Sequence, residues 1–331
     1  MHVVYTIFIP LTHDVSDLVP VKAIKPKDAP ATYELDLEFA TVHQNTTEHQ
    51  KVTISERWLT IGKTVTVGEF RYRLPNSFET AQINLKNQIN EHLKTEFLSQ
   101  TNYPGDLIEE YLAVVIDDAP LSAERFIKKH AYGISRFIRS IDEKISAAQA
   151  EEILATRVSY SQDYMTVVDW EGAIIFAPLP EAEDDIDLLT IANYQLLKYR
   201  LLDRQIEDRL QAIQTLINQK GLRWLDAKHR LQLIINTQIE FMLDFDKIDR
   251  SLLLIGDWYS AKLYRHIVNK FYINDWRSKI HTKLETLAQI EEMARQNFTL
   301  SWDRLFDVIQ LGGWLILLVG YFVLFYVDLA R

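Results

Sequence analysis

The stretch from Val308 to Val327 reads V-I-Q-L-G-G-W-L-I-L-L-V-G-Y-F-V-L-F-Y-V and carries no charge over twenty positions. A helix of this length spans about 30 Å, the thickness of the hydrocarbon core of a bilayer. Thirteen of its residues are Leu, Ile, Val or Phe. Their summed insertion free energy is about −4 to −8 kcal/mol. The alternative is a core helix buried on every side. We expect residues 308–327 to form a single C-terminal transmembrane helix.

The flanks of this stretch suggest how the chain is oriented. Residues 1–9 lack the basic segment that opens a signal peptide, and Pro10 and Asp14 interrupt the apolar run early. Arg295 and Arg304 precede the apolar stretch, which is the sign expected of a cytoplasmic flank. We therefore expect a tail-anchored, single-pass membrane protein with its N-terminal bulk in the cytoplasm.

Proline divides the rest of the chain. All nine prolines lie at or before Pro180. Because proline breaks helices, only the second half is free to form long ones. The expected regions are a β-rich part (1–75), an α/β part (76–180), a helical bundle or stalk (181–307) and the membrane helix (308–327).

The first 180 residues mix two periodicities. Residues 33–39 alternate apolar and acidic side chains, as a half-buried strand does. The apolar parity changes at Gly68, which suggests a β-bulge there. We expect an α+β fold, a mostly antiparallel sheet with helices packed on one face. Its expected strands are 1–9, 33–39, 52–61, 64–74 and 112–116, its hairpin is 164–177, and its helices begin near Asn76, Ser122 and Ser146.

The second half has a heptad pattern. Apolar residues recur at spacings of three and four from Leu189 to Ile217, and Asp203 is the one polar residue on that seam. Gly221 and Gly256 interrupt the helical pattern, and a last helix beginning near Trp276 has no break before the membrane. An oligomeric coiled-coil stalk and an antiparallel bundle both fit. We favour the bundle because the two glycines are placed for turns.

Composition and motifs give no sign of catalysis. The chain has no cysteine and a net charge of −10, which argues against thiolate chemistry, structural zinc sites and nucleic-acid binding. It has no phosphate-binding glycine loop and no nucleophile elbow. We predict no catalytic, cofactor-binding or metal-ligating residue. His43 and His49 are read as a solvated polar loop, His130 as a packed core residue, and the carboxylates of residues 181–187 as a charged helix start.

Two further clusters of residues stand out in the second half of the chain. Lys198, Arg200, Arg204 and Arg209 stand among acidic residues on one helix, a pattern typical of a solvated face. Between Gly256 and the last helix the sequence is rich in aromatic residues. A packing hub is the default reading of that region, and a surface that docks a partner is the alternative.

The segments Leu254–Tyr259, Leu263-Tyr264, Phe271–Ile273, Trp276-Arg277 and 280–293, followed by a terminal span, resemble the family named "required for meiotic nuclear division". The resemblance would cover roughly residue 112 to the C-terminus. It implies a membrane-bound, non-catalytic helper, linked in some members to organellar translation.

The leading functional hypothesis is a membrane-anchored, cytoplasm-facing scaffold or adaptor without catalysis. It would contact the bilayer through the C-terminal helix and a protein partner, or a second copy, through the helical half. The alternative is a subunit of an oligomeric ion transporter with a layout like that of CorA channels, although the second span and Gly-Met-Asn signature of those channels are absent. A third option is an enzyme using residues such as Asp169 or Glu171.

Overall fold

The computed structural model describes residues 1–11, 39–61, 64–117, 122–218 and 258–329. The chain divides into two compact units. Unit 1 is Met1–Arg204 with Phe241–Lys279, and unit 2 is Gln205–Glu240 with Ile280–Arg331. The sheet, and the side chains discussed as a candidate site below, belong to unit 1.

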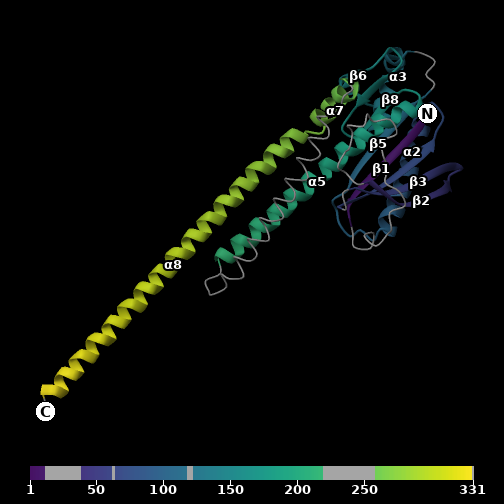
Figure 1. The fold of residues 1–331 in the computed structure, drawn as a ribbon. Helices are drawn as coiled ribbons and strands as arrows, with labels where there is room; N and C mark the ends of the chain where they lie inside the picture. Colours follow the sequence, from purple (N-terminus) through teal and green to yellow (C-terminus); the bar gives the residue numbers. More distant parts are fainter. Residues whose placement is uncertain (12–38, 62–63, 118–121, 219–257, 330–331) are drawn as a thin grey trace. The chain divides into compact units, whose positions relative to one another are not determined.

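Unit 1 is built on one eight-stranded sheet with strand order β2-β3-β4-β1-β5-β8-β7-β6 (Figure 1). All neighbouring strands pair antiparallel except β5 and β8, which pair parallel. The strands are β1 (His2–Pro10), β2 (Phe39–His49), β3 (Val52–Ile61), β4 (Val65–Arg73), β5 (Glu109–Ile116), β6 (Arg157–Ser159), β7 (Met165–Val168) and β8 (Gly172–Phe176). The helices are α2 (Thr80–Gln100), α3 (Ala123–Ile138), α4 (Ala147–Ile153), α5 (Leu179–Asn218), α7 (Trp258–Lys270) and α8 (Ile273–Leu329).

The expected fold class is confirmed: an α+β protein with a mixed, mostly antiparallel sheet and packed helices, followed by further helices. The strands expected at 1–9, 52–61, 64–74 and 112–116 are present, as is the hairpin of β7 and β8. Ser146 and Gln149 form the expected capping box, each side chain bonding the other residue's backbone N–H.

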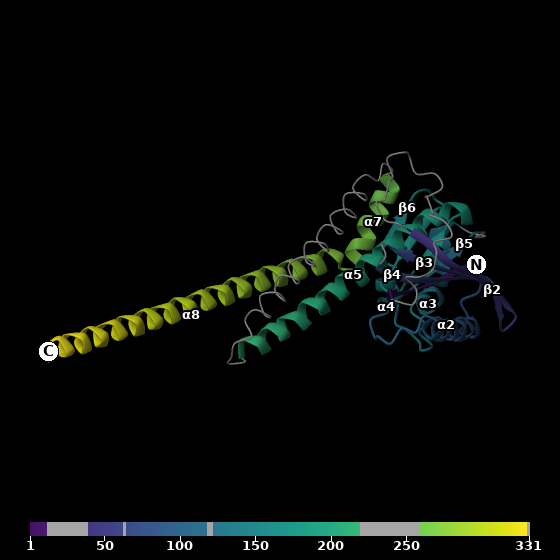
Figure 2. The ribbon, with the colours of Figure 1, turned by 60° about the horizontal axis from the view of Figure 1, so that its bottom comes forward.

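Helices cover both faces of the sheet, not one as the sequence suggested. Successive residues of a strand point to opposite faces, and β4 shows where they go. The Tyr72 hydroxyl donates to Asn90 Oδ1 of α2 at 2.6 Å. The neighbouring Arg71 instead pairs with Glu183 of α5. The first face packs an apolar core against α2 and α3, and α5 crosses the second (Figure 2).

Burial on both faces also explains why the bulge predicted at Gly68 was wrong. Strand β4 pairs without interruption across Gly68, so there is no bulge at that residue. A parity change is harmless in a strand that is buried on both sides.

The register shifts instead at Thr41/His43 of β2, a strand where we expected a polar loop. Helix α2 has Glu79 at its N-cap without a side-chain cap bond, so the box expected from Asn76 is absent. The strand expected at 33–39 lies outside the described residues apart from Phe39.

The heptad pattern correctly marks a buried helix. Leu189, Ala192, Leu196 and Ile206 are buried, and so is every residue from 188 to 199. Helix α8 is continuous from Ile273 to Leu329, as expected for the last helix. The expected helix at 222–255 and the glycines flanking it lie outside the described residues.

Two ion pairs fix how α5 and α8 run. Asp203 pairs with Lys279 at 3.4 Å and Glu207 with Lys283 at 2.6 Å. Both members advance by four residues from one pair to the next, so the two helices are parallel where they meet. Ile280 and Leu284 are buried on the same segment of α8.

The apolar stretch 308–327 lies within α8. Judged on the side chains that the structure describes, no helix is both long and apolar enough to cross a membrane. The described side chains leave out Val308, Leu324, Phe325 and Val327.

Gly172 offers a test of the parallel pair of strands. A Cβ built on it would lie 2.6 Å from the Leu112 carbonyl oxygen of β5, a backbone atom that cannot move without breaking the sheet. We expect Gly172→Ala to lower the free energy of unfolding by about 1–3 kcal/mol. Urea unfolding of the full chain in detergent, followed by circular dichroism, measures this. The control is Glu171→Ala at the exposed neighbouring position; an equal effect of both substitutions would contradict the prediction.

Candidate functional site

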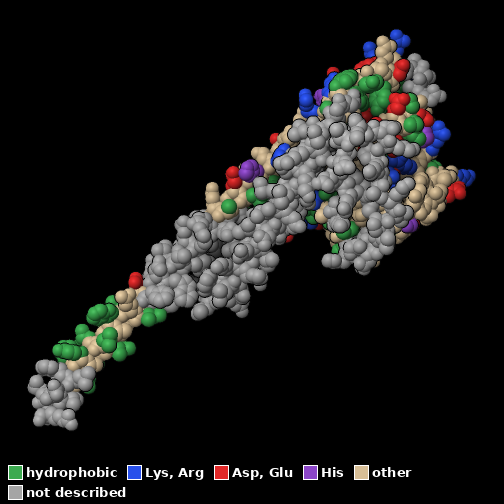
Figure 3. Space-filling view, in the orientation of Figure 1, with side chains coloured by type: hydrophobic (Ala, Val, Ile, Leu, Met, Phe, Trp, Pro, Cys, Tyr) green, Lys and Arg blue, Asp and Glu red, His purple; other side chains and the backbone are tan. Residues whose placement is uncertain are grey.

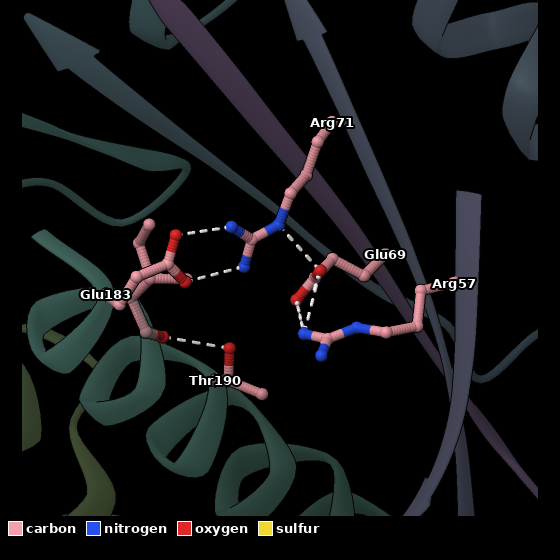
Figure 4. A network of polar contacts seen from close by, with 6 residues as sticks. Arg57, Glu69, Arg71, Glu183 and Thr190 are labelled. Atoms are coloured by element: carbon pink, nitrogen blue, oxygen red, sulfur yellow. Dashed lines mark hydrogen bonds and ion pairs between the residues drawn. The ribbon is translucent and has the colours of Figure 1, made fainter. Parts of the chain in front are cut away.

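The second face of the sheet carries a chain of charges beneath α5 (Figure 4). Arg57 of β3 donates from Nη2 to both oxygens of Glu69 on β4, each at 2.9 Å. Arg71 donates from Nε to Glu69 at 2.7 Å and from Nη2 to Glu183 of α5 at 2.8 Å. Burial alone would raise the pKa of Glu69, but the two guanidiniums hold it below its ordinary value. The network joins two strands to the helix that covers them.

A second charged centre lies at the hairpin between β7 and β8. The Asp169 side chain is fully buried, with 0% exposure. Arg139, at the end of α3, donates to its two oxygens at 2.7 and 3.0 Å, and Lys270 of α7 lies 3.1 Å from Oδ1. The Tyr111 hydroxyl donates to its backbone carbonyl at 3.0 Å. Asp169 thus ties the ends of two helices to one hairpin.

This arrangement limits what Asp169 can do chemically. Burial would raise its pKa, but the bonds from Arg139 and Lys270 outweigh burial and hold the pKa below the ordinary value. A carboxylate with both oxygens engaged and a lowered pKa is a poor general acid or base near neutral pH. Glu171, the other residue considered for an enzyme, is exposed as a whole, and partial burial of its carboxyl group raises its pKa.

Lys86 of α2 is an ionisable residue that the sequence did not reveal. Its side chain is completely buried and donates to the Phe137 carbonyl at 2.6 Å and to Ser140 Oγ at 2.7 Å. Burial lowers the pKa of Lys86 to about 7. Because both acceptors lie at the C-terminal end of α3, the amine caps that helix, where orphan carbonyls favour a cation.

A third buried group, Asp185 of α5, lies among aromatic residues. It accepts hydrogen bonds from the hydroxyls of Thr166 and, at 3.1 Å, Tyr259. Around it the rings of Tyr160, Tyr164 and Tyr259 contact one another at centroid distances of 5.2 to 5.8 Å. No charged partner was evident for this residue from the sequence.

The structure separates the histidines and acidic residues noted in the sequence. His130 packs on the Phe126 ring with centroids 4.7 Å apart but is only half-buried, so it lies at the margin of the core in which the sequence placed it. His43 contacts the Trp58 ring at a tilt of 47°, and His49 stacks on His92 of α2, so both belong to packed contacts. Of the 181–187 carboxylates, Glu181 is in the first turn of α5, whereas Glu183 and Asp185 reach different strands. Within the described residues no group of three or more His, Cys, Asp or Glu is placed to hold a metal ion.

The basic residues of α5 form the predicted solvated face only in part: the side chain of Arg204 is 47% exposed, whereas Lys198 is buried. Lys198 is only 1% exposed. Arg200 pairs with Glu109 at the start of β5, and Arg204 with Asp106 at 2.6 Å. The side chain of Arg209 lies outside the described residues. The mixed charges of this helix therefore serve contacts with the sheet and its loops.

The aromatic region divides in two. Tyr259 and Phe271 are buried, as a packing hub requires, and Phe271 contacts the Tyr111 ring at 5.4 Å. Trp258 and Tyr272 are 57% and 59% exposed. Trp258 stacks on Tyr160, and Tyr272 contacts Trp170.

Comparison with known proteins finds a relative whose similarity includes part of the sheet. Residues 54–182 match the family described as "Uncharacterized protein MJ0711, N-terminal domain". The uncharacterized protein MJ0711 of Methanocaldococcus jannaschii is 25% identical over 213 residues, or 64% of this chain. The match spans 66% of that relative, just under two thirds of its length. No solved structure matches.

These matches correct the family resemblance drawn from the sequence. The chain is similar to MJ0711, and the resemblance to the "required for meiotic nuclear division" family is wrong. That resemblance rested on aromatic and apolar spacings in residues 254–293, and such spacings recur in any amphipathic helix. The matched range contains Arg57, Glu69 and Asp169, and it ends before Glu183 and Asp185.

Removing the Asp169 carboxylate should destabilise unit 1. Asp169→Ala leaves Arg139 and Lys270 without their shared partner and empties a buried position. Because those cations are 27% and 20% exposed, we expect a loss of about 3 kcal/mol, the low end for breaking a buried pair. Urea unfolding of the full chain measures it. Asp163→Ala, at an exposed position, is the matched control and should cost nothing measurable.

Acid should weaken the same contacts. The pKa values of Asp169 and Glu69 are lowered in the folded state, so below the unfolded value of about 4 the unfolded chain binds more protons. The stabilisation these groups provide is thus present above that value and lost as pH falls through their folded pKa values. Asp169→Asn should show a smaller loss of stability between pH 5 and pH 3 than the native chain. An unchanged slope would count against the assignment.

Proposed function

We propose that the protein is a membrane-anchored scaffold or adaptor, without catalytic activity of its own, held in the bilayer by the C-terminal part of α8 as a single span. The observation that carries this proposal is the exposure of apolar side chains at that end of the helix (Figure 3). Leu311, Trp314, Leu315, Ile316, Leu317, Leu318, Val319, Tyr321, Phe322, Val323 and Tyr326 are between 52% and 76% exposed.

The exposure surrounds the helix. Residues 314 to 318 are five consecutive positions, and at 100° per residue they cover every direction around the axis. A helix that is apolar on all sides needs an apolar surrounding, and large apolar surfaces facing water are rare in soluble proteins. A bilayer supplies such a surrounding, and the twenty uncharged residues of the stretch match its thickness.

The scaffold role is supported by the ion pairs that the buried carboxylates of unit 1 make. Glu69 and Asp169 have their carboxylates engaged by arginine or lysine from neighbouring elements, an arrangement that holds secondary structure in place. The exposed rings of Trp258 and Tyr272 provide aromatic surface of the kind enriched at protein interfaces. In this proposal the N-terminal bulk faces the cytoplasm and binds a protein partner there.

The anchor is tested by placing charge in it. Each of Leu317→Arg and Leu318→Arg changes the insertion free energy by about 3–4 kcal/mol, so the pair offsets most or all of the favourable total. We expect the native chain to stay in the membrane pellet after carbonate extraction and the double variant to move to the supernatant. The control pair, Leu317→Val with Leu318→Val, should stay in the pellet. Release of the native chain by carbonate would refute the anchor.

The same preparation distinguishes the scaffold from an oligomeric ion-transport subunit. One span for each chain lines a pore only in an assembly. A monomeric mass from light scattering in detergent eliminates the transporter, and a stable ring-sized mass favours it over the scaffold.

A further inference from the structure

Asp185 joins three elements at one buried point. Its side chain belongs to α5 and is 1% exposed. Thr166 of β7 and Tyr259 of α7 both donate to Oδ2, and their own hydroxyl oxygens lie 3.2 Å apart. The Tyr164 hydroxyl, in the loop before β7, donates to the Glu181 carbonyl at 3.1 Å, and the Tyr164 ring contacts that of Tyr259. These contacts attach the first turn of α7 to the body of unit 1.

The other oxygen of Asp185 has no partner. Oδ1 is buried and makes no hydrogen bond. Within the described part of the chain no cation pairs with this carboxylate. The charged neighbour is Asp184 on the same helix, which has the same sign; β7 contributes Thr166, and α7 and the loop contribute the hydroxyls of Tyr259 and Tyr164. Lys262, on α7, lies over the Trp258 ring.

We propose that Asp185 is a proton-controlled latch for α7: the neutral acid holds α7 against α5 and β7, and the ionised form loosens it. A buried carboxylate without a cation is costly, whereas the acid keeps Oδ2 as an acceptor for the hydroxyls and carries no charge. When α7 opens, water reaches the carboxylate and removes that cost. Ionisation therefore favours the open state.

Linkage gives the size of the effect. Burial raises the pKa of Asp185 to about 6 in the closed state. A solvated aspartate titrates at about 3.9. The closed state thus binds the proton more tightly, and the equilibrium for opening rises about tenfold between pH 5 and pH 8.

The two ends of α7 should respond differently. Lys270, its last residue, is held by Asp169, whose pKa is lowered, so this contact does not titrate between pH 5 and pH 8. Opening is expected at the end that carries Trp258 and Tyr259, with the Lys270 end as the pivot.

Amide hydrogen exchange on the full chain in detergent tests the latch. Exchange of residues 258–267 is measured at pH 5 and pH 8 and corrected for the intrinsic chemical rate. We expect the corrected opening to be about tenfold greater at pH 8 in the native chain and equal at the two values in Asp185→Asn. Glu181→Gln, an exposed carboxylate in the first turn of α5, is the matched control and should keep the tenfold change.

Tyr259→Phe provides a second variant should Asp185→Asn fail to fold. It removes a donor that favours the ionised form, so the midpoint of the pH-dependent opening should move to higher pH. Equal corrected exchange at both pH values in the native chain would overturn the proposal. A tenfold change that persists in Asp185→Asn, or an unmoved midpoint in Tyr259→Phe, would do the same.

Discussion

The central strands are buried on both faces, and the rest of unit 1 is arranged to satisfy that constraint. Strand β1 is buried at every interior position, and β5, β7 and β8 are nearly so. The first face meets the constraint with apolar side chains. The second face carries Arg57, Glu69 and Arg71, and burying these is tolerable only because each charge has a partner of opposite sign. Glu183 of α5 supplies the second acidic partner, so the helix that covers this face also balances its charge.

Asp169 meets the same constraint at the edge of the sheet. Its partners stand 30 residues before it and 101 residues after it in the chain, at Arg139 and Lys270. One buried carboxylate therefore sets where α3 ends and where α7 ends. Lys86 acts in the same way for the last carbonyls of α3. The ends of these helices are defined by distant side chains more than by their own capping residues.

Local patterns in the sequence predicted what local forces determine. The hairpin at residues 164–177, the capping box of Ser146 and Gln149 and the unbroken α8 depend on turn geometry, on capping and on the absence of proline. The buried face of α5 followed from heptad spacing. Strand β2 was missed because its side chains are mostly polar, as suits a strand at the edge of a sheet.

The candidate site could not be read in the same way. Lys198, Lys86 and Asp185 look like ordinary solvated residues in sequence, because their burial depends on contacts between segments far apart in the chain. Asp169 and Glu171 were singled out together, yet they lie two positions apart in one hairpin and the first is buried whereas the second is exposed. The position of a residue along the chain says little about whether its side chain will be buried or exposed.

The paired charges between α5 and α8 have a consequence for sliding. Asp203 and Glu207 face Lys279 and Lys283, and the two pairs are one helical turn apart. A shift of α8 by one turn, about 5.4 Å, toward the N-terminus of α5 brings Lys283 opposite Asp203 and moves Glu207 away from both lysines. A shift of half a turn leaves Asp203 between Lys279 and Lys283 and moves Glu207 away from Lys283. The two helices therefore have two preferred axial positions. The observed one keeps both of these ion pairs, and the one a full turn away keeps one of them, so an axial force on α8 would move it from the first to the second.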